Sequence, residues 1–140
     1  MTARRVLVDT NVWGAELDPR SEPLHHRYAR HLVDTAPAVA AQTVVELRYG
    51  ALKSNWGQRR LDRLERLLHQ AVVIPVDDHL LWVHARLRAA CQRIGHPLHD
   101  KAHNGDLWIA ASAAAHDLPL ITDDRLFEGV PGLTVVTAPA

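Results

Sequence analysis

The sequence predicts an α/β fold built around a mostly parallel sheet. Short apolar runs of strand length alternate along the chain with longer segments whose apolar residues recur at helical spacing. The chain has 140 residues, of which 47% are hydrophobic, so it can bury one sizeable core. Because no segment has the composition of a linker or a repeat, we expect a single domain over residues 1–140.

The first two elements follow from their apolar pattern. Residues 6–8 form an uninterrupted apolar run, which predicts a strand buried on both faces. Residues 23–34 predict a helix, because Leu24, Tyr28 and Leu32 recur every four residues and so share one face.

The next three elements are a strand and two helices. Residues 37–41 predict a short strand, although its alanines weaken the signal. Residues 43–54 predict a helix, with Thr43 and Glu46 in the spacing of a capping box at its start. Residues 57–70 predict another helix, whose leucines form a buried stripe.

The rest of the chain continues the alternation of strands and helices. The long central helix is expected to end where Gly95 and Pro97 follow it. The strands are expected at residues 72–74, 120–122 and 133–136, and the helical segments at 78–94, 105–117 and 123–127. This pattern leaves the order of the strands across the sheet open.

Composition narrows the class of protein. Lysine plus arginine and aspartate plus glutamate number 16 each, which argues against a protein that coats nucleic acid through bulk charge. A local basic patch beside an acidic site stays possible. The single cysteine, Cys91, excludes an internal disulfide and fits a reducing compartment. The apolar run before Asp9 is too short for a signal peptide or a membrane span, so we expect a cytoplasmic protein.

Carboxylates follow predicted strands or begin predicted helices at four separate places in the chain. These residues are Asp9, Glu46, Asp106 and the pair Asp123 and Asp124. Each of them has an ordinary explanation by itself, as a helix cap or as a first-turn charge that interacts with the helix dipole. In open α/β sheets, however, ligands bind beyond the carboxyl ends of the strands, so the four places are expected to meet in one cleft.

Converging carboxylates favour a particular chemistry. Like charges at close range repel each other and raise each other's pKa. A hard divalent cation such as Mg²⁺ or Mn²⁺ prefers oxygen ligands and relieves this repulsion. A metal held in this way can activate water and neutralise charge at a phosphate, so the pattern favours hydrolysis of a phosphodiester.

Three segments of the chain carry a family resemblance. VLVDTNVW, TVVELRYGAL and GDLWIAASAAAHDLPLITDDRLF resemble the PIN-domain nucleases and, more closely, the VapC-type toxins of bacterial toxin–antitoxin pairs. The resemblance extends over nearly the whole chain, in order and in spacing. It implies a three-layer α/β/α sandwich and an endoribonuclease that cleaves RNA with Mg²⁺ or Mn²⁺. It also implies a homodimer and a VapB-type antitoxin as partner.

The same resemblance assigns roles to individual residues. The catalytic acids that it implies are Asp9, Glu46, Asp106 and Asp124. Within this set the metal ligands that it implies are Asp9, Asp106 and Asp124. Supporting positions are Thr10, Asn11, Thr122 and Asp123. Because Asp123 is an additional acid directly before Asp124, the choice of the fourth acid stays open.

Two histidines near Asp106 allow a competing interpretation. His99 and His103 stand four residues apart, which on a regular helix would suit zinc. Pro97 and Gly105 bracket the segment and argue against such a helix, so contact of one of these histidines with a substrate phosphate is favoured over a zinc site.

Other prominent side chains have both a structural and a functional interpretation. The basic run comprises Arg59, Arg60, Arg63 and Arg66, and it forms either a solvated face or a phosphate-contacting strip. Trp13 and Trp56 are interpreted either as core anchors or as exposed anchors for a partner or a base. Trp82 and Trp108 are predicted to lie in the core.

Two functions compete with that of a ribonuclease toxin. A non-catalytic PIN-like module would bind RNA or protein, but the presence of all four matched acids favours an active enzyme. A phosphatase with an aspartyl nucleophile usually carries a second aspartate two residues after the first, where this chain has Asn11. The sequence leaves the identity of the RNA, the metal and the antitoxin open.

Overall fold

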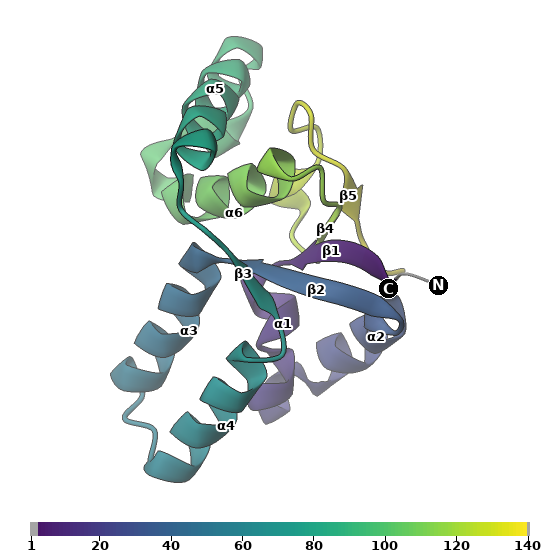
Figure 1. The fold of residues 1–140 in the computed structure, drawn as a ribbon, viewed down its shortest axis with the longest axis vertical. Helices are drawn as coiled ribbons and strands as arrows, with labels where there is room; N and C mark the ends of the chain where they lie inside the picture. The colour runs from purple at the N-terminus through teal and green to yellow at the C-terminus, as the bar shows by residue number, and fades with distance from the viewer. Residues whose placement is uncertain (1–2, 140) are drawn as a thin grey trace.

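The computed structural model describes residues 3–139 and contains one sheet of five strands, whose neighbouring strands are all parallel. Across the sheet the strands lie in the order β3-β2-β1-β4-β5 (Figure 1). The strands are β1 Arg4–Val8, β2 Thr35–Ala40, β3 Val72–Ile74, β4 Leu120–Ile121 and β5 Val135–Val136. The α-helices are α1 Thr10–Trp13, α2 Glu22–Leu32, α3 Ala41–Lys53, α4 Gln58–Leu68, α5 Asp78–Ile94 and α6 Asn104–Ala115. Short 3₁₀ helices lie at η1 Ala15–Leu17, η2 Pro19–Ser21, η3 Pro97–His99, η4 Lys101–His103 and η5 Arg125–Phe127.

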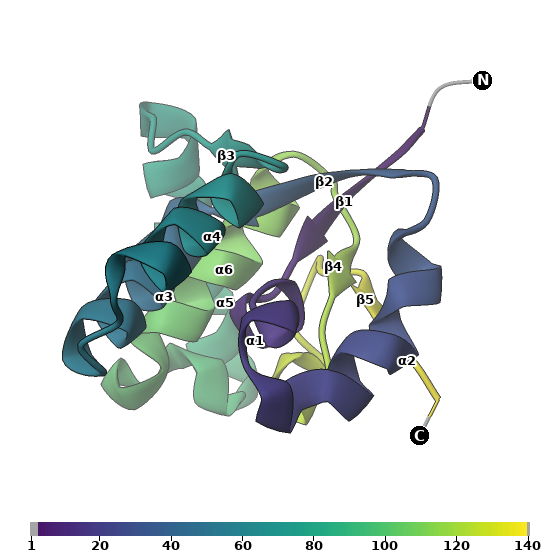
Figure 2. The ribbon, with the colours of Figure 1, turned by 90° about the horizontal axis from the view of Figure 1, so that it is seen from below.

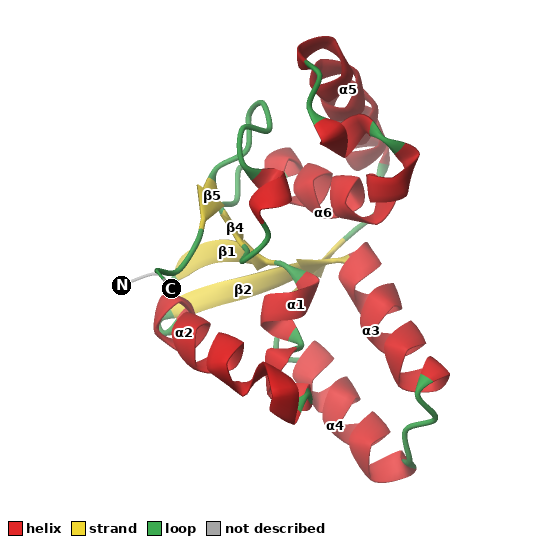
Figure 3. Cartoon of the chain, turned by 180° about the vertical axis from the view of Figure 1, so that it is seen from behind, coloured by secondary structure: helices red, strands yellow, loops and turns green. Residues whose placement is uncertain are grey.

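Helices cover both faces of the sheet and create three layers. Helices α5 and α6 lie on one face and α1 to α4 on the other (Figures 1 and 3). The central strand β1 serves both layers, because Leu7 packs in the core beneath α5 and α6 while Val6 and Val8 pack in the opposite core. This arrangement confirms the predicted α/β/α sandwich around a parallel sheet.

The turn after β1 differs from the sequence expectation by one extra element. Asp9 caps a short helix, α1, which begins directly at Thr10. Figure 2 shows this helix at the arrowhead end of β1, beside the end of β4. Helix α1 therefore keeps Asp9 and the residues after it at the carboxyl edge of the sheet.

The predicted capping box at the start of α3 is wrong. Strand β2 runs straight into α3 with Ala40 as the N-cap, so Thr43 lies within the helix and is fully buried. Its hydroxyl oxygen lies 2.8 Å from that of Thr10, and Glu46 accepts a hydrogen bond from Gln42. The helix begins two residues earlier than expected, so Thr43 contacts Thr10 of α1 and Glu46 is bonded to Gln42 within α3.

The helices on the other face largely match their predictions. Asp77 caps α5 through the backbone N–H of Leu80, and Gly95 ends the helix at a φ of 73°. The expected core position of Trp82 is wrong, since this side chain on α5 is 59% exposed. Cys91, also on α5, is fully buried, as is common for a free cysteine. Within residues 3–139, no helix is long and apolar enough to cross a membrane.

Candidate active site

The topology brings the carboxyl ends of two neighbouring strands to one edge of the sheet. Strands β1 and β4 are parallel neighbours, so Asp9, which follows β1, lies beside the residues that follow β4. A cavity of about 300 Å³ opens here and is lined by Asp9, Asn11, Leu24, Asp123, Asp124 and Arg125. The cavity therefore joins two of the four predicted places, since its lining includes neither Asp106 nor Glu46.

Asp9 is a buried carboxylate with both oxygens occupied. The side chain is 5% exposed. Its Oδ1 accepts a hydrogen bond from the backbone N–H of Thr10 at 2.8 Å, and its Oδ2 accepts one from the hydroxyl of Thr122 at 2.7 Å. Burial raises the pKa of Asp9 to about 6, and the charges of Asp106 and Asp124 act in the same direction.

Asp106 belongs to the same electrostatic centre. It lies in the first turn of α6, where its charge also interacts favourably with the helix dipole. Burial raises its pKa, and the charges of Asp124 and then Glu46 add to the shift. His103 partly offsets the repulsion, since its Nδ1 lies 3.5 Å from Asp106 Oδ2.

Glu46 reaches this centre from α3, because a glycine lets two helices approach. Its Oε1 accepts a hydrogen bond from Gln42 Nε2 at 3.1 Å. A Cβ atom on Gly105 would lie 3.0 Å from that same Oε1 and 3.1 Å from Gln42 Nε2. Glycine at position 105 therefore allows the start of α6 to pack against the side chain of Glu46.

The predicted supporting residues form a hydrogen-bonded frame. Thr122 is fully buried, donates to Asp9 through its hydroxyl and accepts from the backbone N–H of Asp124 at 3.0 Å. The Thr10 hydroxyl meets the Thr43 hydroxyl of α3. Asn11 is exposed and lines the cavity. These contacts place the residues at the site, while their roles in catalysis stay predictions.

Asp123 and Asp124 have different surroundings. Asp123 Oδ1 lies 2.8 Å from the guanidinium of Arg27 and 2.9 Å from the hydroxyl of Tyr28. Asp124 caps η5 through the backbone N–H of Leu126, and its charge raises the pKa of both Asp9 and Asp106. Asp124 is therefore the member of the pair that shares an electrostatic centre with the other acids.

The donor set fits a hard divalent cation. The four acids supply only oxygen donors, and burial, together with the smaller effect of the charges of Asp106 and Asp124, raises the pKa of Asp9. Within residues 3–139, no three carboxylate, histidine or thiol groups already converge into a complete cage. Protein hydrogen bonds orient Asp9, but the carboxylates would have to move closer together to ligate one cation.

The histidine segment does not offer a second metal site in the described chain. His99 and His103 lie on two separate 3₁₀ turns, as Pro97 and Gly105 led us to expect. The Nδ1 of His99 is 2.6 Å from the carbonyl oxygen of His96. His103 instead contacts Asp106 at the acidic centre.

All four arginines of the basic run are exposed, and two of them contact other parts of the protein. Arg60 stacks on Trp56 with its guanidinium carbon 3.8 Å from the ring centroid, and Arg63 donates to the carbonyl of Glu16. Trp13 is 8% exposed and packs in the core, so it is not an exposed anchor. The sequence analysis missed Arg27 as a site residue, since nothing in its neighbourhood along the chain distinguishes it.

Three relatives of known name align with the chain. Residues 6–133 match the PIN domain. The chain is 36% identical over 107 residues to "Ribonuclease VapC5" of Mycobacterium tuberculosis, which covers 75% of this chain and 76% of that protein. It is 29% identical to "Ribonuclease VapC4" of the same organism, over 98% of this chain and 99% of that protein. It is 27% identical to the "tRNA(fMet)-specific endonuclease VapC" of Salmonella typhimurium, over 94% and 96%.

Several solved structures share this fold, among them two described as VapBC proteins. VapBC from Salmonella typhimurium, solved bound to DNA, superposes with a TM-score of 0.78 at 25% identity and covers 96% of this chain and 98% of that one. VapBC-5 from Mycobacterium tuberculosis gives a TM-score of 0.65 at 29% identity, over 97% and 98%. The likeness therefore extends over essentially the whole fold.

Proposed function

Because this chain belongs to the PIN-domain family, in its VapC branch, we propose that it is a metal-dependent endoribonuclease acting as the toxin of a toxin–antitoxin pair. One observation carries the proposal. The buried Asp9 is held by Thr122 at the edge of the sheet, within electrostatic reach of Asp106 and Asp124. A protein that used Asp9 only as a helix cap would gain nothing from surrounding it with further negative charge.

The side chains suggest a division of labour. Asp9, Asp106 and Asp124 are the proposed ligands of Mg²⁺ or Mn²⁺, which when bound supplies charge neutralisation at the phosphate and activation of water. The hydrogen bonds from Thr10 and Thr122 orient Asp9 before any ligand arrives. Glu46, oriented by Gln42, is the carboxylate that we propose accepts a proton from the attacking water.

The RNA substrate is inferred from the relatives. Two of them are named ribonucleases and one a tRNA-specific endonuclease. We propose a structured RNA as substrate, with Arg125 and Asn11 as the cavity-lining groups closest in chemistry to a phosphate or base contact. The cytoplasm, where RNA and the antitoxin are made, is the compartment in which we expect the enzyme to act.

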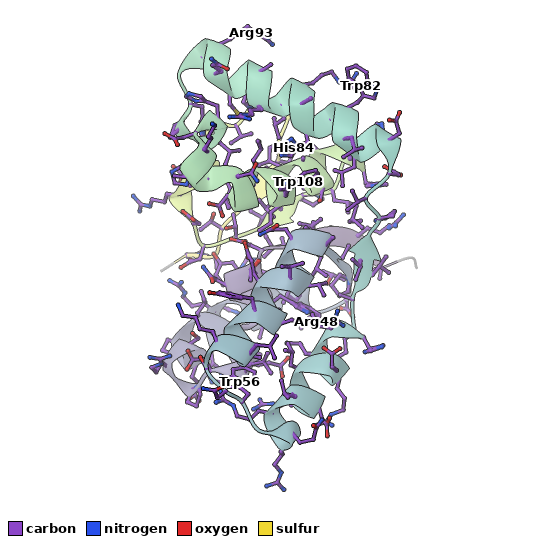
Figure 4. The ribbon with its side chains drawn as sticks, turned by 90° about the vertical axis from the view of Figure 1, so that its left-hand side faces the viewer. Arg48, Trp56, Trp82, His84, Arg93 and Trp108 are labelled. Atoms are coloured by element: carbon purple, nitrogen blue, oxygen red, sulfur yellow. The ribbon has the colours of Figure 1, made fainter. Side chains whose placement is uncertain are left out.

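A second copy of this chain is the proposed partner for its apolar face. We define the apolar face as the exposed residues Val45, Tyr49, Leu52, Val76, Leu81 and Trp82. The three residues on α3 are spaced four and three apart, so they share one side of that helix. Figure 4 shows α3 toward the viewer and Trp82 projecting from α5. Burying such a surface between two copies would remove it from water.

An antitoxin of the VapB type is the second proposed partner. A cavity of about 270 Å³ between α3 and α4 is lined by Arg48, Leu52, Leu61, Leu64 and Glu65. The ion pair between Arg48 and Glu65 lies at this apolar cleft, with 2.7 Å between the two groups. A short apolar helix of the antitoxin fits such a lining. A basic side chain of the antitoxin would complement the carboxylates of the acidic centre.

The experiment is cleavage of structured RNA by wild type and by Asp9→Asn, in Mn²⁺ or Mg²⁺ and in EDTA. Asparagine caps a helix nearly as well as aspartate but removes one charged ligand. Loss of several kcal/mol of transition-state stabilisation predicts a fall of about a thousandfold or more. Asp62→Asn, an exposed aspartate on α4, is the matched control and should cleave normally.

Two outcomes would contradict the proposal in different ways. Undiminished, EDTA-resistant cleavage by Asp9→Asn would refute the metal centre. A wild type that binds RNA but never cleaves it, with any of the three metals Mg²⁺, Mn²⁺ or Zn²⁺, would favour the non-catalytic binding module.

A further inference from the structure

Helix α2 makes direct contacts with the loop that carries the fourth acid. Tyr28 is 1% exposed, and its hydroxyl lies 2.9 Å from both the Thr122 carbonyl oxygen and Asp123 Oδ1. The same hydroxyl accepts from the backbone N–H of Ala138 at 3.0 Å. One buried phenol therefore joins α2, the segment after β4 and the C-terminal segment.

Arg27 holds the same carboxylate from the neighbouring position. Its guanidinium lies 2.8 Å from Asp123 Oδ1, and the two side chains are 34% and 37% exposed. The Arg27 Nε is buried and, among the residues described, has no hydrogen-bond partner. Because the guanidinium is partly removed from solvent, its charge-assisted contact with Asp123 is less screened than an ion pair on the open surface.

The loop of residues 122–124 connects these contacts to Asp124 through hydrogen bonds of Thr122. Thr122 is bonded through its carbonyl to Tyr28 and through its backbone N–H to Val136. Its hydroxyl accepts from the Asp124 backbone N–H and donates to Asp9. A shift of Asp123 would therefore disturb the residues on both sides of it, including the bond that sets Asp124.

We propose that Arg27 and Tyr28 are positioning residues that clamp Asp123 and thereby place Asp124 for metal binding. In this arrangement Asp123 is the anchor of the loop and does not ligate the metal. The inference rests on the proposed function, because it assigns a role to residues around the proposed metal centre. The Tyr28 hydroxyl carries one proton, which it can donate either to the Thr122 carbonyl oxygen or to Asp123 Oδ1.

Charge and positioning make opposite predictions for Arg27→Gln. Removing a positive charge from beside a cation site should tighten Mn²⁺ binding if Arg27 acts only through its field. If Arg27 positions the loop, the dissociation constant for Mn²⁺ should instead rise, by roughly tenfold for the loss of one charge-assisted bond. Arg27→Lys keeps the ion pair and should restore most of the affinity. Arg30→Gln, an exposed arginine one turn further along α2, is the matched control and should bind like wild type.

A second measurement needs no metal at all. The Asp124 amide donates to the Thr122 hydroxyl, so hydrogen exchange at this amide in the metal-free protein reports the state of the loop. We expect exchange to be roughly tenfold faster in Arg27→Gln and in Tyr28→Phe, and unchanged in Arg30→Gln. A thermal melt of each variant verifies that the fold survives, and the more exposed Arg27 site remains informative if Tyr28→Phe is too unstable. In steady-state cleavage the turnover rate should fall, while KM for RNA stays the same.

The outcomes separate this inference from the proposed function. Unchanged or tighter Mn²⁺ binding by Arg27→Gln, or an unaltered Asp124 amide, would overturn the clamp. So would an Asp123→Asn variant that loses Mn²⁺ as completely as Asp124→Asn, because Asp123 would then be a ligand. Failure of the proposed function appears elsewhere, as undiminished cleavage by Asp9→Asn, and leaves the exchange measurement valid.

Discussion

The acidic centre and the apolar face depart in opposite directions from the usual placement of groups in a folded protein. At the acidic centre a carboxylate, Asp9, is buried and its pKa is raised to about 6. On the apolar face Tyr49 and Leu52 are 62% and 69% exposed. Burying charge and exposing apolar surface both reduce the stability of an isolated chain.

The two regions differ in how rigidly they are built. Asp9 is held by two hydrogen bonds at 2.7 and 2.8 Å within a buried frame of threonines. The apolar face is exposed instead: three of its residues project from α3 and two from α5, and Val76 lies between β3 and α5. A small ligand such as a cation needs donors oriented in advance, whereas a protein surface can adjust its side chains as it associates. The comparison indicates that the acidic centre depends on fixed donor positions, whereas the apolar face depends on the area that it can bury.

The largest expected change in stability comes from Asp9→Asn in the metal-free protein. A folded pKa raised from 3.8 to about 6 means that the native state binds more protons than the unfolded state between these values. The free energy of unfolding therefore falls as the pH rises through this window, by on the order of 1–3 kcal/mol. At pH 8 the variant should be more stable than wild type by about this amount.

The pH dependence checks the sign of this effect. Near pH 4, Asp9 of the wild type is protonated in the folded state, so the advantage of Asp9→Asn should largely disappear. Thermal or urea unfolding at both pH values measures the difference, with Asp62→Asn as control. An equal advantage at both pH values would mean that desolvation of the charge is not its cause.

Metal binding should compensate the same repulsion. At a concentration one hundred times its dissociation constant, Mn²⁺ should stabilise wild type by about 2.7 kcal/mol. Asp9→Asn should gain much less, because it lacks one charged ligand. Differential scanning fluorimetry with and without EDTA measures both shifts, and an equal gain in the two proteins would place the cation elsewhere.

A charge on the apolar face should act on association instead of on the fold. Tyr49→Glu should weaken the proposed dimer by roughly tenfold or more, since a buried unpaired charge at an interface is costly. Its monomer stability should change by less than about 0.5 kcal/mol, because the side chain is already 62% exposed. Sedimentation over a range of concentrations measures the dimer, with the exposed Arg66→Glu on α4 as control. A wild type that stays monomeric at high concentration would contradict the dimer itself.

The smallest change in stability and in cleavage is expected from a substitution at Val45, where the two regions are adjacent along the chain. Helix α3 carries Val45 of the apolar face next to Glu46 of the acidic centre. Val45→Thr keeps the shape and replaces a methyl group with a hydroxyl at an exposed position, so stability should change by less than about 0.5 kcal/mol. RNA cleavage should stay within about twofold of wild type. A large loss of cleavage would show that the two regions are coupled through α3.

The local pattern of the sequence determined the main elements and the acids of the site. The run Val6–Leu7–Val8 predicted a buried strand, and its residues are 0% exposed in β1. The expected helix over residues 105–117 is α6, with Asp106 in its first turn. These features are set by residues within a few positions of each other, whose apolar spacing and helix preferences act before any distant contact forms.

Only the tertiary structure decided how those acids are held. The bond between Thr10 and Thr43 spans 33 residues, and the contact between Tyr28 and Asp123 spans 95. Both depend on strand order, which places β1 between β2 and β4 and which apolar spacing does not encode. The exposure of Trp82 has the same origin, because a pattern shows which residues are apolar but not whether a neighbouring layer reaches far enough to cover them.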